Sequence, residues 1–104
     1  MLRDLLFGFM KAHILYHAGR EPVYGVWLQE ELTRHGYEIS PGTLYPALSS
    51  LLKDGYLEQE KRVVDGRARK YYRLTPAGQA ALDEVRAKAQ ELLDEICEEH
   101  DPLE

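Results

Sequence analysis

Apolar residues recur at helical spacing in two segments near the start of the chain. In residues 2–17 they lie three or four positions apart and would cover more than one side of a helix, which predicts a helix buried on two sides. These residues are Leu2, Leu5, Leu6, Phe9, Met10 and Ile14, with Phe7 and Leu15 beside them. A second helix is expected between Pro22 and Gly36, with apolar positions at Tyr24, Trp27, Leu28 and Leu32.

The segment from Ser40 to Lys53 predicts a third helix, although two prolines lie near its start. Ser40 is a favourable N-cap, and Pro41 suits the first helical position, where its missing N–H is not needed. The buried side has apolar residues at helical spacing, namely Leu44, Ala47, Leu48, Leu51 and Leu52. Pro46 removes one backbone hydrogen bond, so we expect the first turn to be loose or kinked.

After Gly55 the helical period gives way to short segments typical of strands. Residues 56–64 and 70–74 predict two strands, and Asp65-Gly66 predicts a hairpin turn within a loop of a few residues. The fold class is therefore mostly α with a small β-hairpin.

Thr75 followed by Pro76 again resembles an N-cap and a first helical position, and a long helix is expected from there to about residue 99. The order of three helices, a hairpin and a helix is that of a winged helix-turn-helix. Residues 1–75 would form the winged helix-turn-helix domain, and residues 76–104 a C-terminal dimerisation helix, within one compact unit.

Charge is distributed unevenly along the 104 residues, whose net charge is −5. Residues 1–40 contain four basic and five acidic side chains, net −1. Residues 41–75 contain seven and four, net +3, and residues 76–104 contain two and nine, net −7. A basic middle segment beside an acidic end indicates that function is divided along the sequence, and the alternative is that these charge blocks are only solvated faces.

The polar side of the third helix and the basic hairpin are the predicted DNA-binding surface. The helix start presents free N–H groups to a phosphate, and a glycine there allows close approach of the backbone. From this helix we predict contacts by Ser40, Gly42, Thr43, Tyr45, Ser49, Ser50 and Lys53. From the hairpin, which could bind flanking phosphates or the minor groove, we predict contacts by Arg62, Gly66, Arg67, Arg69 and Lys70. The alternative is a buried helix with a small polar face.

The last helix has apolar residues spaced alternately by three and four, as in the seam of a coiled coil. They are Leu82, Val85, Ala89, Leu92 and Ile96, and Leu93 widens the stripe. We expect a second copy of the chain to cover this stripe, rather than the helix's own domain. The first helix would complete the dimer interface with Leu2, Leu5, Leu6 and Phe9.

Three stretches of the chain, SPGTLYPALSSLLKDGYLE, DGRARKYYRLTPAG and YGVWLQEEL, together resemble the PadR family of bacterial transcriptional regulators. The resemblance covers nearly the whole chain. It implies a homodimeric winged-helix repressor that binds double-stranded DNA and is released by a small ligand. By position it implies that Thr43 and Tyr45 contact DNA and that residues 66–70 form the wing. The single C-terminal helix is similar to that of the short subfamily.

Other chemistry is weakly represented. His13 and His17 have the i, i+4 spacing of a metal-binding pair, but no third ligand is evident, so no metal site or cofactor is predicted. Cys97 lies among glutamates that disfavour a thiolate, and as a single cysteine it suits a reducing compartment. The short apolar run at the N-terminus is neither a signal nor a membrane span, so a cytoplasmic protein is expected. No catalytic pattern is present, which argues against an enzyme.

These observations favour a sequence-specific, DNA-binding transcriptional regulator that acts as a dimer on a palindromic operator. The alternative is a protein-interaction module, in which the winged helix binds a protein instead of DNA. Such a module would not need the basic hairpin or a third helix whose first N–H groups are free to bind a phosphate. A variant that senses a metal or another ligand, with DNA binding secondary, is a third interpretation.

Overall fold

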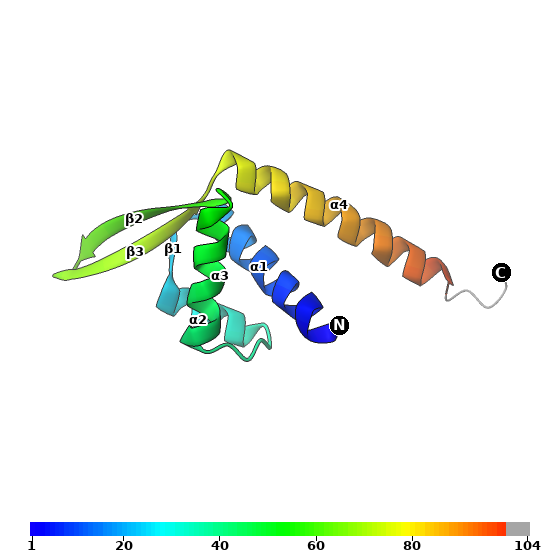
Figure 1. The fold of residues 1–104 in the computed structure, drawn as a ribbon, viewed down its shortest axis with the longest axis horizontal. Coiled ribbons are helices and arrows are strands. Elements are labelled where there is room, and N and C mark those ends of the chain that lie inside the picture. The colour runs from blue at the N-terminus through cyan, green and yellow to red at the C-terminus, as the bar shows by residue number, and fades with distance from the viewer. Residues whose placement is uncertain (100–104) are drawn as a thin grey trace.

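The structure is a computed structural model and describes residues 1–99. Its elements are α1 (Leu2–Arg20), β1 (Val23–Tyr24), α2 (Gly25–Arg34), α3 (Pro41–Lys53), β2 (Leu57–Val64), β3 (Arg67–Leu74) and α4 (Pro76–Glu99). Helices α1 to α3 pack together, the β2–β3 hairpin projects to one side, and α4 extends to the other (Figure 1). This arrangement is the winged helix-turn-helix predicted from the sequence, with mostly helical structure and one long C-terminal helix.

One apolar core joins α1, α2, α3 and the base of the sheet. The predicted stripe of α3 is buried except for Leu52, which is half-buried, and the inner positions of α2 are buried. The buried apolar residues are Met10, Ile14, Leu15, Ala18, Val23, Leu28, Leu32, Leu44, Ala47, Leu48, Leu51, Leu57 and Tyr72. From α1, Met10 and residues that follow it contribute to this core. The expectation that α1 is buried on two sides is therefore wrong within a single chain, because the apolar side chains that precede Met10 are exposed.

The sheet has three antiparallel strands in the order β1-β3-β2, one more than expected. Strand β1 pairs Val23 with Tyr72 and Tyr24 with Tyr71. From sequence alone Tyr24 is expected on the apolar side of the second helix, because two residues are too short to show strand alternation. The strand matters for the site because it attaches the start of α2 to the hairpin.

The hairpin is tighter than expected. Strand β3 begins at Arg67 rather than at residue 70, so Asp65 and Gly66 alone form the turn. Both have positive φ, 53° and 78°, as a type I′ turn requires, and aspartate and glycine are among the residues that adopt this conformation most readily. The basic side chains therefore project from a regular two-stranded ribbon and not from a flexible loop.

Helix α3 begins at the predicted proline and continues across Pro46 without a break. Its first turn is tight rather than loose, because the Ser40 carbonyl accepts hydrogen bonds from the N–H groups of both Thr43 and Leu44, each at 3.0 Å. Ser40 has the extended backbone of an N-cap, but its side chain makes no capping bond. The Ser40 hydroxyl lies instead 3.4 Å from that of Thr43.

Helix α4 is attached to the domain at its first turn. The Thr75 hydroxyl donates a 2.6 Å hydrogen bond to the Gly55 carbonyl and accepts one from the Gly78 N–H at 3.0 Å. Gly78 packs directly on the backbone carbonyl of Tyr56, where no side chain would fit. Beyond Leu82, which packs against the core, α4 projects away from the domain (Figure 1). None of the helices within residues 1–99 combines the length and apolarity needed to cross a membrane.

Candidate nucleic-acid interface

The outer side of α3 is exposed and mostly polar. Gly42, Thr43, Tyr45, Ser49 and Lys53 are all exposed, as is Ser40 just before the helix. The opposite side is buried in the core. The helix is thus anchored by one face, and the face predicted to contact DNA is open to solvent.

Ser50 does not belong to that exposed face. It is half-buried, and its hydroxyl accepts a 3.1 Å hydrogen bond from the Lys11 ammonium of α1. Ser50 is three positions after the buried Ala47, which turns its side chain toward α1. The structure therefore places this predicted DNA contact in the packing between α1 and α3.

Tyr45 lies at the edge of the exposed face, against the start of α2. A Cβ atom at Gly25 would be 2.5 Å from the Tyr45 hydroxyl oxygen and 3.0 Å from the ring carbon that carries it. The ring thus occupies the space that a side chain at position 25 would need. In the described part of the chain the Tyr45 hydroxyl has no hydrogen-bond partner within the protein, and 45% of the residue is exposed.

The strand register sorts the basic residues of the hairpin onto two faces. Lys61 is opposite Lys70, and Arg62 is opposite Arg69. Cross-strand partners share a face and successive residues alternate, so the two lysines lie on one face. Arg62, Arg67 and Arg69 lie on the other. Lys70 is therefore separated from the arginines with which the sequence analysis grouped it, and Lys61 is a further basic residue that the analysis missed.

Aromatic rings hold two of these arginines. The Arg62 guanidinium is 4.7 Å from the centre of the Tyr71 ring and 3.0 Å from the Glu60 carboxylate. The Arg69 guanidinium is 4.6 Å from the centre of the Tyr24 ring. These contacts fix the side chains against the ribbon, and only Arg62 is partly neutralised.

The other basic side chains of the ribbon are not neutralised. Within residues 1–99, no carboxylate lies within 4.0 Å of the charged groups of Lys61, Arg67, Arg69 or Lys70. Like charges directly opposite each other destabilise a strand pair. An anionic partner would remove that repulsion, so the ribbon has the charge pattern of a polyanion-binding element.

The predicted dimerisation residues form a second exposed surface. A trough of about 840 Å³ runs between α1 and α4 and is lined mainly by apolar side chains, including Leu5, Phe9, Val85, Leu92 and Ile96. Ala89 and Leu93 also line it, and 57% of Leu92 is exposed. Among the other predicted residues, Leu82 packs on the core, Leu2 is 60% exposed, and Leu6 lines a separate hollow beside the α2–α3 turn.

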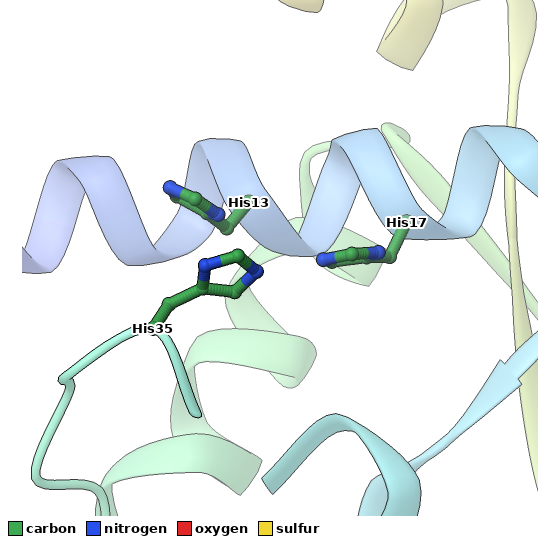
Figure 2. Close-up of side chains that lie close together, drawn as sticks. All are labelled: His13, His17 and His35. Atoms are coloured by element: carbon green, nitrogen blue, oxygen red, sulfur yellow. The ribbon is translucent and has the colours of Figure 1, made fainter. Parts of the chain in front are cut away.

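The structure brings a third histidine to the pair on α1. His35, the C-cap residue of α2, lies beside His13 and His17 (Figure 2). One ring nitrogen from each of the three lies within 4.8 Å of the others. The Glu31 carboxylate is 3.7 Å from His17 Nε2 and 3.4 Å from His35 Nε2. This third ligand is not evident from the sequence because His35 is distant from the pair along the chain.

Known proteins resemble this chain over most of its length. Residues 14–84 match the model of the "Transcriptional regulator PadR-like family". The chain is 54% identical to "Transcriptional regulator Rv3488" of Mycobacterium tuberculosis over 95 residues, which cover 91% of this chain and 89% of that protein. That name describes a regulator and not an enzyme.

Solved structures agree with the sequence comparisons. A PadR family transcriptional regulator from Eggerthella lenta superposes with a TM-score of 0.82 at 34% identity, covering 98% of this chain and 90% of that one. A PadR-like regulator from Bacillus cereus gives a TM-score of 0.85 at 29% identity, covering 94% and 97%. The resemblance inferred from the sequence motifs is thereby confirmed: the chain belongs to the PadR-like family of transcriptional regulators.

Proposed function

We propose that the protein is a homodimeric transcriptional repressor that binds a palindromic site in double-stranded DNA and is released by a small ligand. The observation that carries this proposal is the junction between β1 and α2. Tyr45 of α3 packs on Gly25, and Arg69 of the wing stacks on Tyr24, the residue just before it. Helix α3, the proposed recognition helix, and the basic ribbon are therefore held next to each other by two consecutive residues.

The start of each helix in the helix-turn-helix supports phosphate binding beside this junction. Neither Tyr24 before α2 nor Ser40 before α3 makes a side-chain capping bond. The first N–H groups of an α-helix have no partner within the helix and carry the positive end of its dipole. In α3, Pro41 has no N–H and that of Thr43 is bonded to the Ser40 carbonyl. A phosphate oxygen could therefore accept a hydrogen bond from the Gly42 N–H while α3 lies in the major groove.

The apolar trough supports a second copy as the partner. Its lining alternates at three- and four-residue spacing along α4, which suits a helix packed against an equivalent helix. The outer part of α4 has almost no cover within its own chain. A two-fold dimer would place two α3 helices about 34 Å apart, one turn of the DNA helix, as binding to a palindromic site requires.

We propose that a releasing ligand binds in the part of this trough that the second copy would leave open. The trough of a single chain has a volume of about 840 Å³, and small-molecule sites occupy roughly 300–1,000 Å³. A ligand there would contact both α1 and α4 and would bias how the two copies are oriented. Because DNA requires a fixed distance between the two α3 helices, a change in orientation would weaken operator binding.

The DNA-binding proposal is tested by incubating the purified protein with random genomic fragments and sequencing those that it retains. We expect enrichment of an inverted repeat, and titration of a labelled duplex with that repeat should show strong dependence on salt. Retention of no fragment above background would overturn the proposal and would favour a protein-binding winged helix. We further propose that the protein acts in the cytoplasm, where its DNA target would lie.

A further inference from the structure

Three imidazoles converge on the side of α1 that faces α2, apart from the surface assigned to DNA. Their ring centres are 5.0 Å apart for His13 and His35, 5.9 Å for His17 and His35, and 6.5 Å for His13 and His17. Figure 2 shows the His35 ring between those of the two α1 histidines. The rings are tilted rather than stacked, so packing between flat faces does not account for the arrangement.

The Nε2 atom of His17 is buried and has no hydrogen-bond partner in the structure. Its neighbour Glu31 is 3.7 Å away, which is too far for a hydrogen bond. Among the described residues it is the single buried side-chain nitrogen or oxygen left in this state. Buried polar atoms almost always have a partner, so this nitrogen is available to bind a ligand that reaches it.

The surroundings favour neutral imidazoles. Burial lowers the pKa of His13 and of His17 below the usual value, and the nearby histidines add to the effect, although Glu31 opposes it for His17. The rings of Trp27 and Tyr37 lie edge-on to the cluster at 5.4 Å. A neutral imidazole presents a lone pair on one nitrogen, which is the form that binds a metal ion.

We propose that His13, His17 and His35 bind a divalent transition-metal ion of the zinc type, with the Glu31 carboxylate as the fourth ligand or as the hydrogen-bond acceptor of a ligating ring. Three imidazoles and a carboxylate suit zinc, nickel or copper rather than magnesium or calcium, which prefer oxygen ligands. The i, i+4 pair on one helix and a third ligand from a separate element form a common zinc arrangement.

Small side-chain movements would complete the geometry. With metal–nitrogen bonds of about 2.0–2.1 Å, tetrahedral ligand atoms are about 3.3 Å apart, whereas the three nitrogens now lie within 4.8 Å of one another. The side chain of His35 is 42% exposed and follows the last turn of α2, so its ring is the one most able to move inward. The Glu31 side chain is already 3.4 Å from His35 Nε2.

The position of the site gives metal binding a consequence for α3. His35 immediately precedes Gly36, and the turn between α2 and α3 begins at this glycine, which has a φ of 91°. An ion held by all three histidines would tie that turn to α1, the helix that also lines the trough assigned to the second copy. Occupancy would therefore restrict the segment that positions the recognition helix.

The test is titration of the metal-stripped protein with zinc by calorimetry and with cobalt by visible absorption. We expect about one ion per chain and the intense visible bands of four-coordinate cobalt. The variants His35→Gln and His13→Gln should each weaken zinc binding by at least about 100-fold, since changes outside the ligand shell alone cost about 10–100-fold. His100→Gln, which removes the chain's remaining histidine, is the matched control and should retain wild-type affinity.

Hydrogen exchange separates this site from adventitious binding. Zinc should slow amide exchange in residues 36–39 of the wild type and should not do so in His35→Gln, whose circular dichroism should match that of the wild type. Binding that is unchanged in both cluster variants, or lost in His100→Gln alone, would overturn the proposal. These experiments use the metal alone, so their failure would leave the DNA-binding proposal standing.

Discussion

The hydroxyl of Tyr45 lies against the backbone of Gly25, so that the side chain of this α3 residue fills the space that a side chain at the start of α2 would need. This contact holds the tyrosine ring at the helix start where we propose that a phosphate binds. The Tyr45 hydroxyl has no partner in the described chain and can therefore donate to a phosphate oxygen.

We expect Tyr45→Phe to weaken binding to all duplex sequences alike, by about 0.5–1.5 kcal/mol, because one hydrogen bond to a phosphate of the DNA backbone is lost. Fluorescence anisotropy with specific and unrelated duplexes would measure the change. Tyr16→Phe is the control, since Tyr16 is an exposed tyrosine on α1. Equal affinities for wild type and Tyr45→Phe would show that the ring serves only in packing.

The same contact predicts the effect of Gly25→Ala. The added Cβ would meet the Tyr45 hydroxyl and ring, and the end of the side chain must move away. We expect the alanine variant to fold and to lose at least as much DNA affinity as Tyr45→Phe, because it displaces the whole ring. Near-wild-type binding by this variant, measured in the same anisotropy assay, would contradict the proposed role of the junction.

Lys61 and Lys70, which are opposite each other on the β2–β3 ribbon, allow the DNA-binding role of the ribbon to be tested through the salt dependence of DNA binding. If Lys61 and Lys70 each neutralise a phosphate, Lys61→Gln and Lys70→Gln should each reduce the slope of log K against log salt by about 0.9. The slope is obtained from DNA titrations at several salt concentrations. Lys88→Gln, on α4, should leave the slope unchanged, and an equal effect of all three variants would indicate a general charge effect.

The variants Lys61→Gln and Lys70→Gln should each also raise the free energy of unfolding slightly. Removing one of two like charges that are directly opposite on a strand pair relieves about 0.2–1 kcal/mol of repulsion. Urea denaturation at low salt would detect this gain. A loss of stability in both variants would show that the lysines are not repelling each other in the free protein.

Leu92→Glu should convert the proposed dimer to a monomer. The substitution places a carboxylate in the apolar trough, and by symmetry the partner contributes a second one; burying such charges unpaired costs several kcal/mol. Light scattering should report half the mass, and binding to the palindrome should fall much more than binding to a half-site.

The control for Leu92→Glu is Val26→Glu, which puts the same charge at a 60% exposed apolar position on α2. This variant should remain dimeric. If Leu92→Glu also remains dimeric and binds the palindrome normally, α4 is not the interface between copies.

Thr75→Val should loosen the attachment of α4. The change removes the hydroxyl that joins Gly55 to the first turn of the helix, and loss of an N-cap of this kind costs about 1–2 kcal/mol. Urea denaturation monitored by circular dichroism would measure the loss. Thr33→Val, which removes an exposed hydroxyl bonded within its own helix, should change stability by less than about 0.5 kcal/mol.

The sequence by itself determined the helices, the hairpin turn and the division into a basic middle and an acidic end. These features depend on neighbouring residues: apolar side chains at helical spacing, a proline after Ser40 or Thr75, and Asp65-Gly66 at a turn that needs positive φ. Local preferences of this kind are present before any tertiary contact forms. For the same reason the outer face of α3 could be identified, apart from Ser50 at its margin.

Tertiary structure alone decided which distant residues meet. Strand β1 exists because β3 offers it hydrogen-bond partners, and two residues have no periodicity of their own. The pairing of Lys61 with Lys70 follows from the strand register, which is set by the two-residue turn at Asp65-Gly66. His35 joins His13 and His17 only because α2 packs against α1. Such contacts arise from the burial of the shared core, which no local stretch of sequence specifies.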